Sequence, residues 1–362
     1  QASETLTFIN VDAEPVPSLL RGFSAPVVLE AELGDEALFT LLSHDLDPFN
    51  RWEAGQRLML RRILQAVKGD GHIELDERLK EALHAVLRHP DLDAAFKELV
   101  LTLPSEAYVA EQLEVVDPQR IHHVRESLKL QLAHALHDDW LWAYEAHAEL
   151  GGYSPDSLSA GRRALANLAL SMLVLDSTVR QNPIWPGKAL QRFKDAGNMT
   201  DRLGALSALV NAHSELATGA LERFHAQFKD EALVIDKWFT LQAMAPEQGG
   251  KVFARAKALM QHPDFTLRTP NRARSLLMAL CANNPAAFHR ADAAGYVFWA
   301  DRVIDIDAIN PQLAARLARA MDHWRRLAEP YRTAAGEALS RVAQRTELSD
   351  DVREIITRAL QD

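Results

Sequence analysis

Three arginines stand where a helix is expected to begin, in the segment PDFTLRTPNRARSLLMAL at residues 263–280. Thr269 is the expected N-cap, which places Arg272 and Arg274 in the first turns of that helix. A helix N-terminus already carries roughly half a positive charge, so cations at that end are unfavourable unless an anion lies nearby. The chain has no Asp or Glu from 265 to 291. The segment therefore predicts an anionic partner, either a carboxylate from another helix or a bound carboxylate ligand that the guanidinium forks could hold.

Two histidines have a spacing that deserves comparison with metal sites, because paired imidazoles can hold a metal ion. His134 and His137 have the spacing to lie on one helical face beside Asp138 and Asp139, and we expect a surface or capping pair. None of the 14 histidines is followed by Glu, so the HExxH zinc motif is absent. There is no GxSxG motif and no evident histidine partner for Cys281. We expect no catalytic residue and no metal ligand in this chain, which on its own should be inactive.

The composition favours a globular protein and argues against a nucleic-acid-binding, disulfide-rich or membrane protein. The chain has 362 residues, 48% of them hydrophobic, and a formal net charge of −10. Acidic residues are interleaved with basic ones, which argues against a nucleic-acid partner. The single cysteine excludes an internal disulfide framework and favours a reducing, cytoplasmic location. We expect no membrane association, because no uninterrupted apolar run approaches the length of a membrane span. The start QASETLTF has no initiator Met, so we expect part of a longer polypeptide.

The pattern of elements changes near residue 34. Residues 1–34 contain TLTFINV, SLLRGF and VVLEAEL, separated by turn-like DAEPVP and SAP, and are interpreted as two or three strands at the end of a β-domain. Residues 35–362 are helix-periodic almost throughout, with Pro, Gly and capping residues at the boundaries. We predict an all-α, right-handed superhelix or solenoid of about sixteen helices, similar to HEAT or armadillo arrays. His-Pro-Asp occurs at 89–91 and again at 262–264, but no fixed repeat period emerges.

Aromatic residues outside the arginine segment are predicted to be structural. In VIDKWFTLQA, Trp238 and Phe239 should lie in the core, while Asp236 and Lys237 are either solvated or paired. Trp185 in NPIWPG should fill a gap between helices. These assignments leave the arginines as the residues that most need a partner.

Eight motifs then reveal a family resemblance over essentially the whole chain. They are PVPSLLRGFSAPVVL, FNRWEAGQ, LTLPSEAYVAEQ, NMTDRLGALSALV, VIDKWFTLQA, HPDFTLRTPNRARSL, NNPAAFHRADAAGYVFWADRV and NPQLAARL. In this order they resemble the C-terminal region of the bacterial aminopeptidase N family, the zinc alanyl aminopeptidases of the gluzincin group. The resemblance implies that residues 1–34 are the last strands of a β-sandwich domain. It also implies that residues 35–362 form the helical C-terminal domain.

The resemblance also implies a function for the parent protein. Such enzymes use a zinc-activated water to remove N-terminal residues from peptides, and their catalytic domain, with its zinc ligands, is absent from this chain. The helical domain would contact that catalytic domain, cap its site, admit peptides and line the substrate cavity. By motif position, Arg274 in PNRARS and Arg316 in NPQLAARL match family arginines that face this cavity. Arg272 and Arg268 are then free to be structural.

A second class of function remains open from the helical pattern alone. An α-solenoid without its own active site can serve as a stand-alone scaffold for protein interactions. The strand-like residues 1–34 argue against that alternative, because two or three strands do not form a stable sheet domain by themselves.

Overall fold

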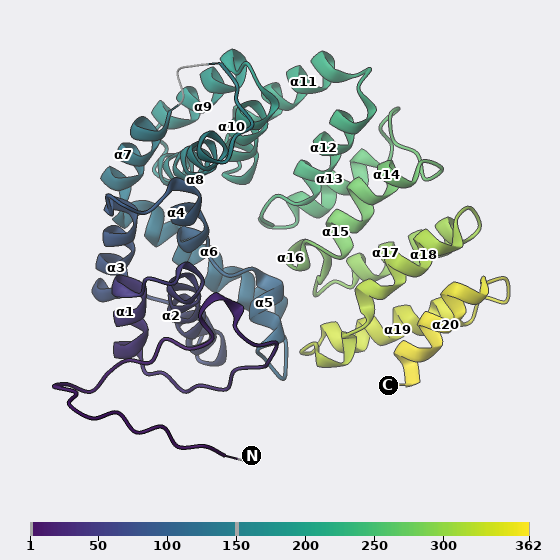
Figure 1. The fold of residues 1–362 in the computed structure, drawn as a ribbon. Helices are drawn as coiled ribbons and strands as arrows, with labels where there is room; N and C mark the ends of the chain where they lie inside the picture. Colours follow the sequence, from purple (N-terminus) through teal and green to yellow (C-terminus); the bar gives the residue numbers. More distant parts are fainter. Residues whose placement is uncertain (1–2, 149–151, 362) are drawn as a thin grey trace.

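A computed structural model describes residues 3–148 and 152–361 of the protein (Figure 1). Its N-terminal half contains α1 (Asp35–His44), α2 (Pro48–Lys68), α3 (Glu77–Arg88), α4 (Ala94–Leu101), α5 (Glu106–Glu111), α6 (Pro118–Ala135), α7 (His137–His147), α8 (Ser157–Val179), α9 (Ile184–Asp195) and α10 (Met199–Asn211). Its C-terminal half contains α11 (Ala217–Phe228), α12 (Ala232–Ala243), α13 (Lys251–Leu259), α14 (Pro270–Ala273), the π turn η2 (Arg274–Met278), α15 (Ala279–Cys281), α16 (Pro285–Phe288), α17 (Ala294–Asp307), α18 (Pro311–Ala318), the 3-10 turns η3 (Arg319–Met321) and η4 (Trp324–Arg326), α19 (Tyr331–Ala343) and α20 (Asp350–Gln361). The predicted all-α solenoid is confirmed.

Helix boundaries follow the local sequence signals. The Asp76 carboxylate accepts a hydrogen bond from the Leu79 N–H at the start of α3, and the Asp93 carboxylate accepts one from the Phe96 N–H at the start of α4. These side chains satisfy N–H groups that have no partner inside the helix. Proline occupies the first turn of α2, α6 and α18, where its missing N–H costs nothing. Several helices are a single turn, so helices outnumber the roughly sixteen expected from average helix lengths.

The longest helix, α8, forms the centre of the N-terminal half. It contacts α4, α6, α7, α9 and α10, and eleven of its residues are buried. Among the described residues, α8 is the one helix that is long and apolar enough to cross a membrane. Half of its most apolar 18-residue window is buried inside the protein. The sequence of α8 is not one uninterrupted apolar run, because Arg163 and Asp176 lie near its ends. Its packing is that of a core helix in a helical domain.

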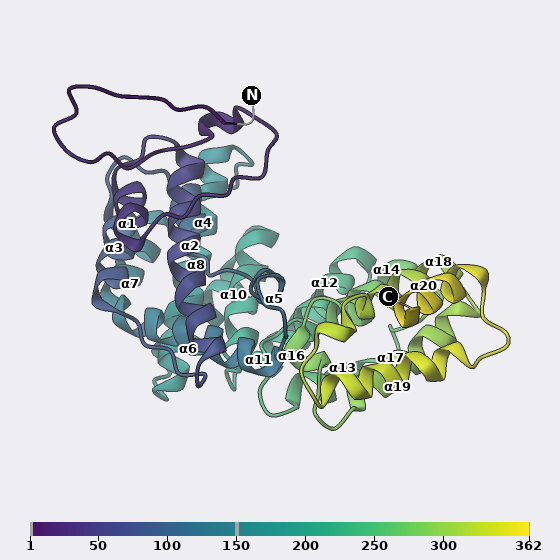
Figure 2. The same cartoon turned by 90° about the horizontal axis from the view of Figure 1, so that it is seen from below.

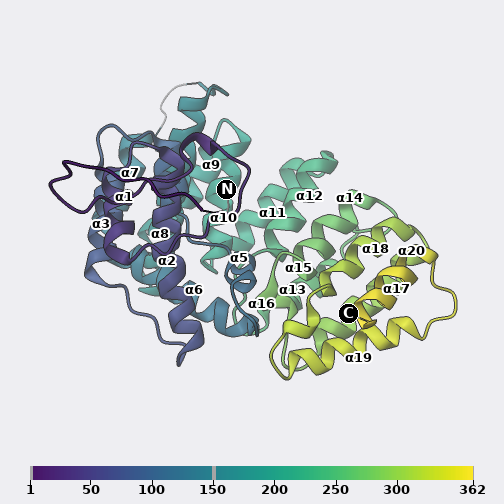
Figure 3. The same cartoon turned by 60° about the horizontal axis from the view of Figure 1, so that its bottom comes forward.

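The C-terminal half is built as two helical layers. Helices α17 and α18 pack together, as do α19 and α20, while α17 contacts α19 and α18 contacts α20. Figure 2 shows α12, α14, α18 and α20 along one side of this half and α13, α17 and α19 along the other, an arrangement that Figure 3 repeats. The two halves meet at an angle in Figure 2, and the layer containing α12, α14, α18 and α20 lies on its inner side.

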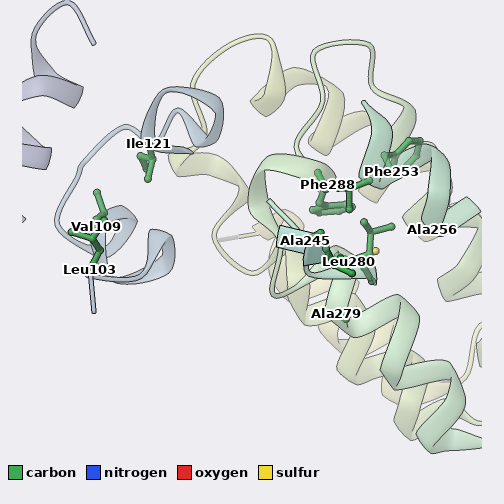
Figure 4. Packing of buried hydrophobic residues seen from close by; sticks show 14 of the residues in the cluster. Leu103, Val109, Ile121, Ala245, Phe253, Ala256, Ala279, Leu280 and Phe288 are labelled. Atoms are coloured by element: carbon green, nitrogen blue, oxygen red, sulfur yellow. The ribbon is translucent and has the colours of Figure 1, made fainter. Parts of the chain in front are cut away.

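Main-chain hydrogen bonds between distant segments join the two halves. The Val116 N–H donates to the Arg326 carbonyl at 2.7 Å, and the Ala328 N–H donates to the Val116 carbonyl at 2.8 Å. The Gln119 side chain donates to two carbonyls at the end of α16, at 2.7 and 2.8 Å. Figure 4 shows apolar side chains on both sides of this seam, including Ile121 from α6 and Phe288 from α16, within one buried cluster. The angle between the halves is therefore held by direct contacts.

The strands expected in residues 1–34 do not form in the part that the structure describes, residues 3–34. These residues are irregular except for the 3-10 turn at Arg21–Phe23. An extended segment becomes a strand only when its N–H and C=O groups pair with a neighbouring strand. Here the Leu19 carbonyl accepts a hydrogen bond from Asn50 at 2.8 Å, and the Ala31 carbonyl accepts one from Arg57 at 2.8 Å. Side chains of α2 thus take the place of a partner strand.

Candidate functional site

The arginine segment begins its helix where the sequence predicted. Thr269 is the N-cap residue and Pro270 the first residue of α14, although the Thr269 side chain makes no capping hydrogen bond. The α-helix lasts only to Ala273, and Arg274 opens the π turn η2. A π turn inside a helix widens the backbone locally and is frequently found at functional sites. The sequence contained no signal for this turn.

Arg272 is the structural member of the segment. Its guanidinium group donates to the Asp236 carboxylate of α12 at 2.5 Å, and the two side chains are only 10% and 16% exposed. The same guanidinium donates to the main-chain carbonyls of Asp264 and Ala232 and lies 5.0 Å from the centre of the Phe239 ring. The anion expected for Arg272 is therefore a carboxylate of the protein itself.

Arg274 and Arg316 have no acidic partner among the described residues. Both are exposed. The Arg274 guanidinium makes one long hydrogen bond, 3.4 Å to the Asn271 side-chain oxygen, and Arg316 makes no hydrogen bond or ion pair within residues 3–148 and 152–361. Arg268 is also exposed, and its backbone N–H donates to the Thr266 hydroxyl at 3.2 Å. These exposed guanidinium groups are free to bind an anion from outside the chain.

The fold places the two exposed arginines in the same layer. Arg274 belongs to η2, which continues α14, and Arg316 lies in α18. Helices α14 and α18 both belong to the layer on the inner side of the angle between the halves (Figure 2). We describe no direct contact between the two side chains.

A cavity lies elsewhere, at the seam between the halves. Its volume is about 220 Å³, and its walls come from α5, the start of α6, α16 and the turns η3 and η4. Apolar side chains such as Ile121 and Met321 alternate there with Glu106 and His323, but neither Arg274 nor Arg316 lines it. The sequence-predicted residues therefore do not belong to this cavity.

Glu106, a carboxylate that lines this cavity, is hydrogen-bonded to a histidine. Glu106 hydrogen-bonds the Nδ1 atom of His122 at 2.7 Å, and the Nε2 atom of His122 contacts the Glu247 carbonyl at 3.0 Å. Burial alone would lower the pKa of His122, but the hydrogen bond and charge of Glu106 outweigh it and raise that pKa. The pair joins α5 to α6 and to the turn that follows α12, which is a structural role.

His134 and His137 converge on a carboxylate. Their Nδ1 atoms lie 3.3 and 3.0 Å from the two oxygens of Asp176, whose side chain is 4% exposed. Arg180 donates to the same carboxylate at 2.9 Å. Both imidazoles are partly exposed, as expected for a surface pair, and Asp138 and Asp139 are not their partners in these contacts. The two imidazoles and Arg180 together hydrogen-bond a buried acid of α8.

The remaining residues singled out in the sequence are structural. Trp238 and Phe239 are buried, and Trp185 packs edge-on against Tyr144 at 5.4 Å. Cys281 is buried, and burial raises the pKa of its thiol, which keeps it protonated and unreactive.

The structure also assembles a group that the sequence did not predict. His225, His262 and Asp264 offer ligand atoms that all lie within 4.8 Å of one another, and they are the one such group of His, Cys, Asp and Glu found within the described ranges. His225 lies in α11 and the other two follow α13, so no local spacing connects them. The only available signal was the His-Pro-Asp motif at 262–264.

The chain is similar to known proteins over nearly its whole length. Residues 35–361 match the family described as "Domain of unknown function (DUF3458_C) ARM repeats", and residues 1–32 match one described as "Domain of unknown function (DUF3458) Ig-like fold". The chain is 37% identical to Aminopeptidase N of Caulobacter vibrioides and 36% identical to Aminopeptidase N of Escherichia coli, over 99% of its length in each case. It spans 41% of the length of each of these relatives. A crystal structure of Legionella pneumophila aminopeptidase A in complex with aspartic acid superposes with a TM-score of 0.86 at 30% identity, covering 98% of this chain and 42% of that one.

Proposed function

Because the chain belongs to the DUF3458_C family of ARM-repeat domains and corresponds to the C-terminal region of aminopeptidase N, we propose that it is the helical domain of a zinc-dependent aminopeptidase. The parent protein would remove N-terminal residues from peptides and serve peptide catabolism. The helical domain would pack on the catalytic domain of the same polypeptide and cap its active site. It would admit peptides to that site and exclude folded proteins. The lone buried Cys281 supports a reducing, cytoplasmic location for the parent protein.

The observation that carries this proposal is a pair of exposed arginines, Arg274 and Arg316, that have no acidic partner among the described residues. A cap must offer its inner surface to the substrate. Helices α14 and α18 lie in the layer on the inner side of the angle between the halves (Figure 2); Arg316 belongs to α18, and Arg274 opens the turn that continues α14. A peptide bound by its N-terminus at a catalytic centre extends its C-terminal carboxylate away from that centre. Exposed guanidinium groups are suited to that carboxylate, because each can bind it bidentately.

The residues of this chain do not fit the catalytic zinc of such enzymes. No His is followed by Glu, so the helix that supplies two imidazoles and a general base is not encoded here. We therefore assign the zinc ion to another domain of the polypeptide and derive no catalytic step through these residues. Residues 1–362 alone are expected to hydrolyse no aminoacyl arylamide. The reading frame upstream should encode HExxH, and its absence would favour the scaffold alternative.

Arg274→Ala in the complete enzyme is expected to raise KM for di- and tripeptides by about tenfold, because a charge-assisted hydrogen bond contributes roughly 1.5 kcal/mol to binding. The value of kcat should change less, since the carboxylate lies away from the scissile bond. Steady-state kinetics with a tripeptide and with an aminoacyl arylamide measure this. The arylamide has no carboxylate, so its KM should stay unchanged.

Arg268→Ala is the matched control for that substitution. Arg268 is an exposed arginine six residues earlier in the same segment, and the family resemblance leaves it free to be structural. Its replacement should leave both substrates unaffected. Unchanged kinetics for Arg274→Ala with short peptides would rule out the binding role.

A further inference from the structure

His225, His262 and Asp264 present two imidazoles and a carboxylate to one point in the C-terminal half. The His225 Nε2 atom lies 2.6 Å from Asp264 Oδ2, and the His262 Nδ1 atom lies 3.8 Å from the same oxygen. The two imidazole rings are 4.9 Å apart and nearly perpendicular. Ligand atoms around a tetrahedral zinc ion are separated by about 3.3 Å, given metal–ligand bonds near 2.0–2.1 Å. The distances from the two imidazole nitrogens to Asp264 Oδ2 bracket that value, and all three ligand atoms lie within 4.8 Å of one another.

We propose that these three residues form a binding site for a divalent transition-metal ion of the Zn²⁺ and Co²⁺ class. Two nitrogens and one carboxylate oxygen suit Zn²⁺, Co²⁺, Ni²⁺ or Cu²⁺, whereas Mg²⁺ and Ca²⁺ prefer oxygen ligands alone. Three ligands from the protein leave at least one position for water. The side chains are 24%, 27% and 37% exposed, so an ion can reach them from solvent. This inference does not depend on the proposed peptidase function.

The other His-Pro-Asp segment, His89–Asp91, has the same local hydrogen bond but no second imidazole beside it among the described residues. In both copies the Asp main-chain N–H donates to the preceding His Nδ1 at 3.2 Å, so His89–Asp91 and His262–Asp264 form the same local turn. A second imidazole, that of His225, faces only the turn at 262–264 among the described residues. The tertiary contact with α11, and not the motif itself, completes the ligand set.

The one cationic side chain described next to the site is already paired with a carboxylate. Arg272 lies next to the site and donates to the Asp264 main-chain carbonyl, but its charge is paired with Asp236. The Asp264 carboxylate therefore remains available to a cation. On binding, the ion would replace the tertiary hydrogen bond from His225 to Asp264 and the local one from the Asp264 N–H to His262.

Trp238 provides a built-in reporter. Its ring centre lies 5.0 Å from that of His225 and 5.2 Å from that of His262. Paramagnetic Cu²⁺ or Co²⁺ held by these imidazoles would quench the fluorescence of Trp238 at very short range. Quenching would be saturable and would be lost with Trp238→Phe.

The test is a Co²⁺ titration of the complete polypeptide followed by visible ligand-field absorption, with metal content measured after desalting. The parent protein should bind one equivalent more than His225→Asn or Asp264→Asn, and affinity for that equivalent should fall on the order of 100-fold in the variants. Asp264→Asn keeps an oxygen that can accept from His225, so it also guards against loss of folding. Comparison with the variants removes the contribution of any other metal site.

His89→Asn is the matched control, because it alters the same turn where no second histidine is present. It should bind as much Co²⁺ as the parent protein and show the same Cu²⁺ quenching. Equal stoichiometry and equal quenching in the parent protein, His225→Asn and Asp264→Asn would overturn the proposal and leave a hydrogen-bonded structural cluster. Folding of each variant is checked by far-UV circular dichroism.

Discussion

Replacing Arg272 by alanine is expected to lower the free energy of unfolding by about 3 kcal/mol, the size of effect seen when one partner of a buried ion pair is removed. The substitution leaves the Asp236 carboxylate, 16% exposed, without the guanidinium that now lies 2.5 Å away. It also removes the hydrogen bonds to the Asp264 and Ala232 carbonyls and the contact with the Phe239 ring. Urea unfolding followed by far-UV circular dichroism would measure the shift in midpoint.

Two further variants test whether the loss of stability comes from the Arg272–Asp236 ion pair and not from any substitution in this segment. Arg274→Ala, two residues away, should change the free energy of unfolding by less than about 0.5 kcal/mol, because the Arg274 side chain is exposed. Adding Asp236→Asn to Arg272→Ala should recover part of the loss, since no buried charge is then left unpaired. A midpoint for Arg272→Ala equal to that of the parent protein would contradict the structural role of the pair.

Gly295→Ala is the second substitution with a large expected effect. Gly295 lies in the first turn of α17, where an added Cβ would stand 1.9 Å from the carbonyl oxygen of Phe288 in α16. No rotamer change relieves a clash between Cβ and a main-chain atom, so α16 and α17 must move apart. Phe288 and Tyr296 are fully buried beside this contact, with ring centres 5.5 Å apart. We expect a loss of about 3 kcal/mol or more, beyond the usual cost of overpacking a core.

Gly219→Ala is the control for that substitution. Gly219 lies inside α11, and a Cβ added there meets no heavy atom within 4 Å. Alanine is the better helix former by up to about 1 kcal/mol, so this variant should be equal to or more stable than the parent protein. Thermal unfolding of both variants measures the difference. Equal stability of Gly295→Ala and Gly219→Ala would show that α16 and α17 do not approach as closely as described.

For the two arginines of the PNRARS motif, the sequence predicted the start of the helix but not the separate role of each arginine. Capping signals and the absence of local acids were enough to place a helix start at Pro270 and to predict that anions would be needed. They could not divide the roles, because the partner of Arg272 comes from α12, 36 residues earlier in the chain. The predicted roles of Arg274 and Arg316 rest on motif position and stay predictions. The π turn that begins at Arg274 was not foreseen, since no residue type specifies it.

Capping residues, hydrophobic periodicity and ordered motifs were enough to predict the helical class, many helix starts and the region of the family to which the chain corresponds, because these are local properties of the sequence. Tertiary structure supplied the contacts between residues that are distant in the chain. It placed His134 and His137 on Asp176, joined Val116 to the segment at Arg326, and left residues 3–34 without strand partners. It also brought His225 to the turn at 262–264. Such pairings are set by how helices pack in the solenoid, and no spacing along the chain encodes them.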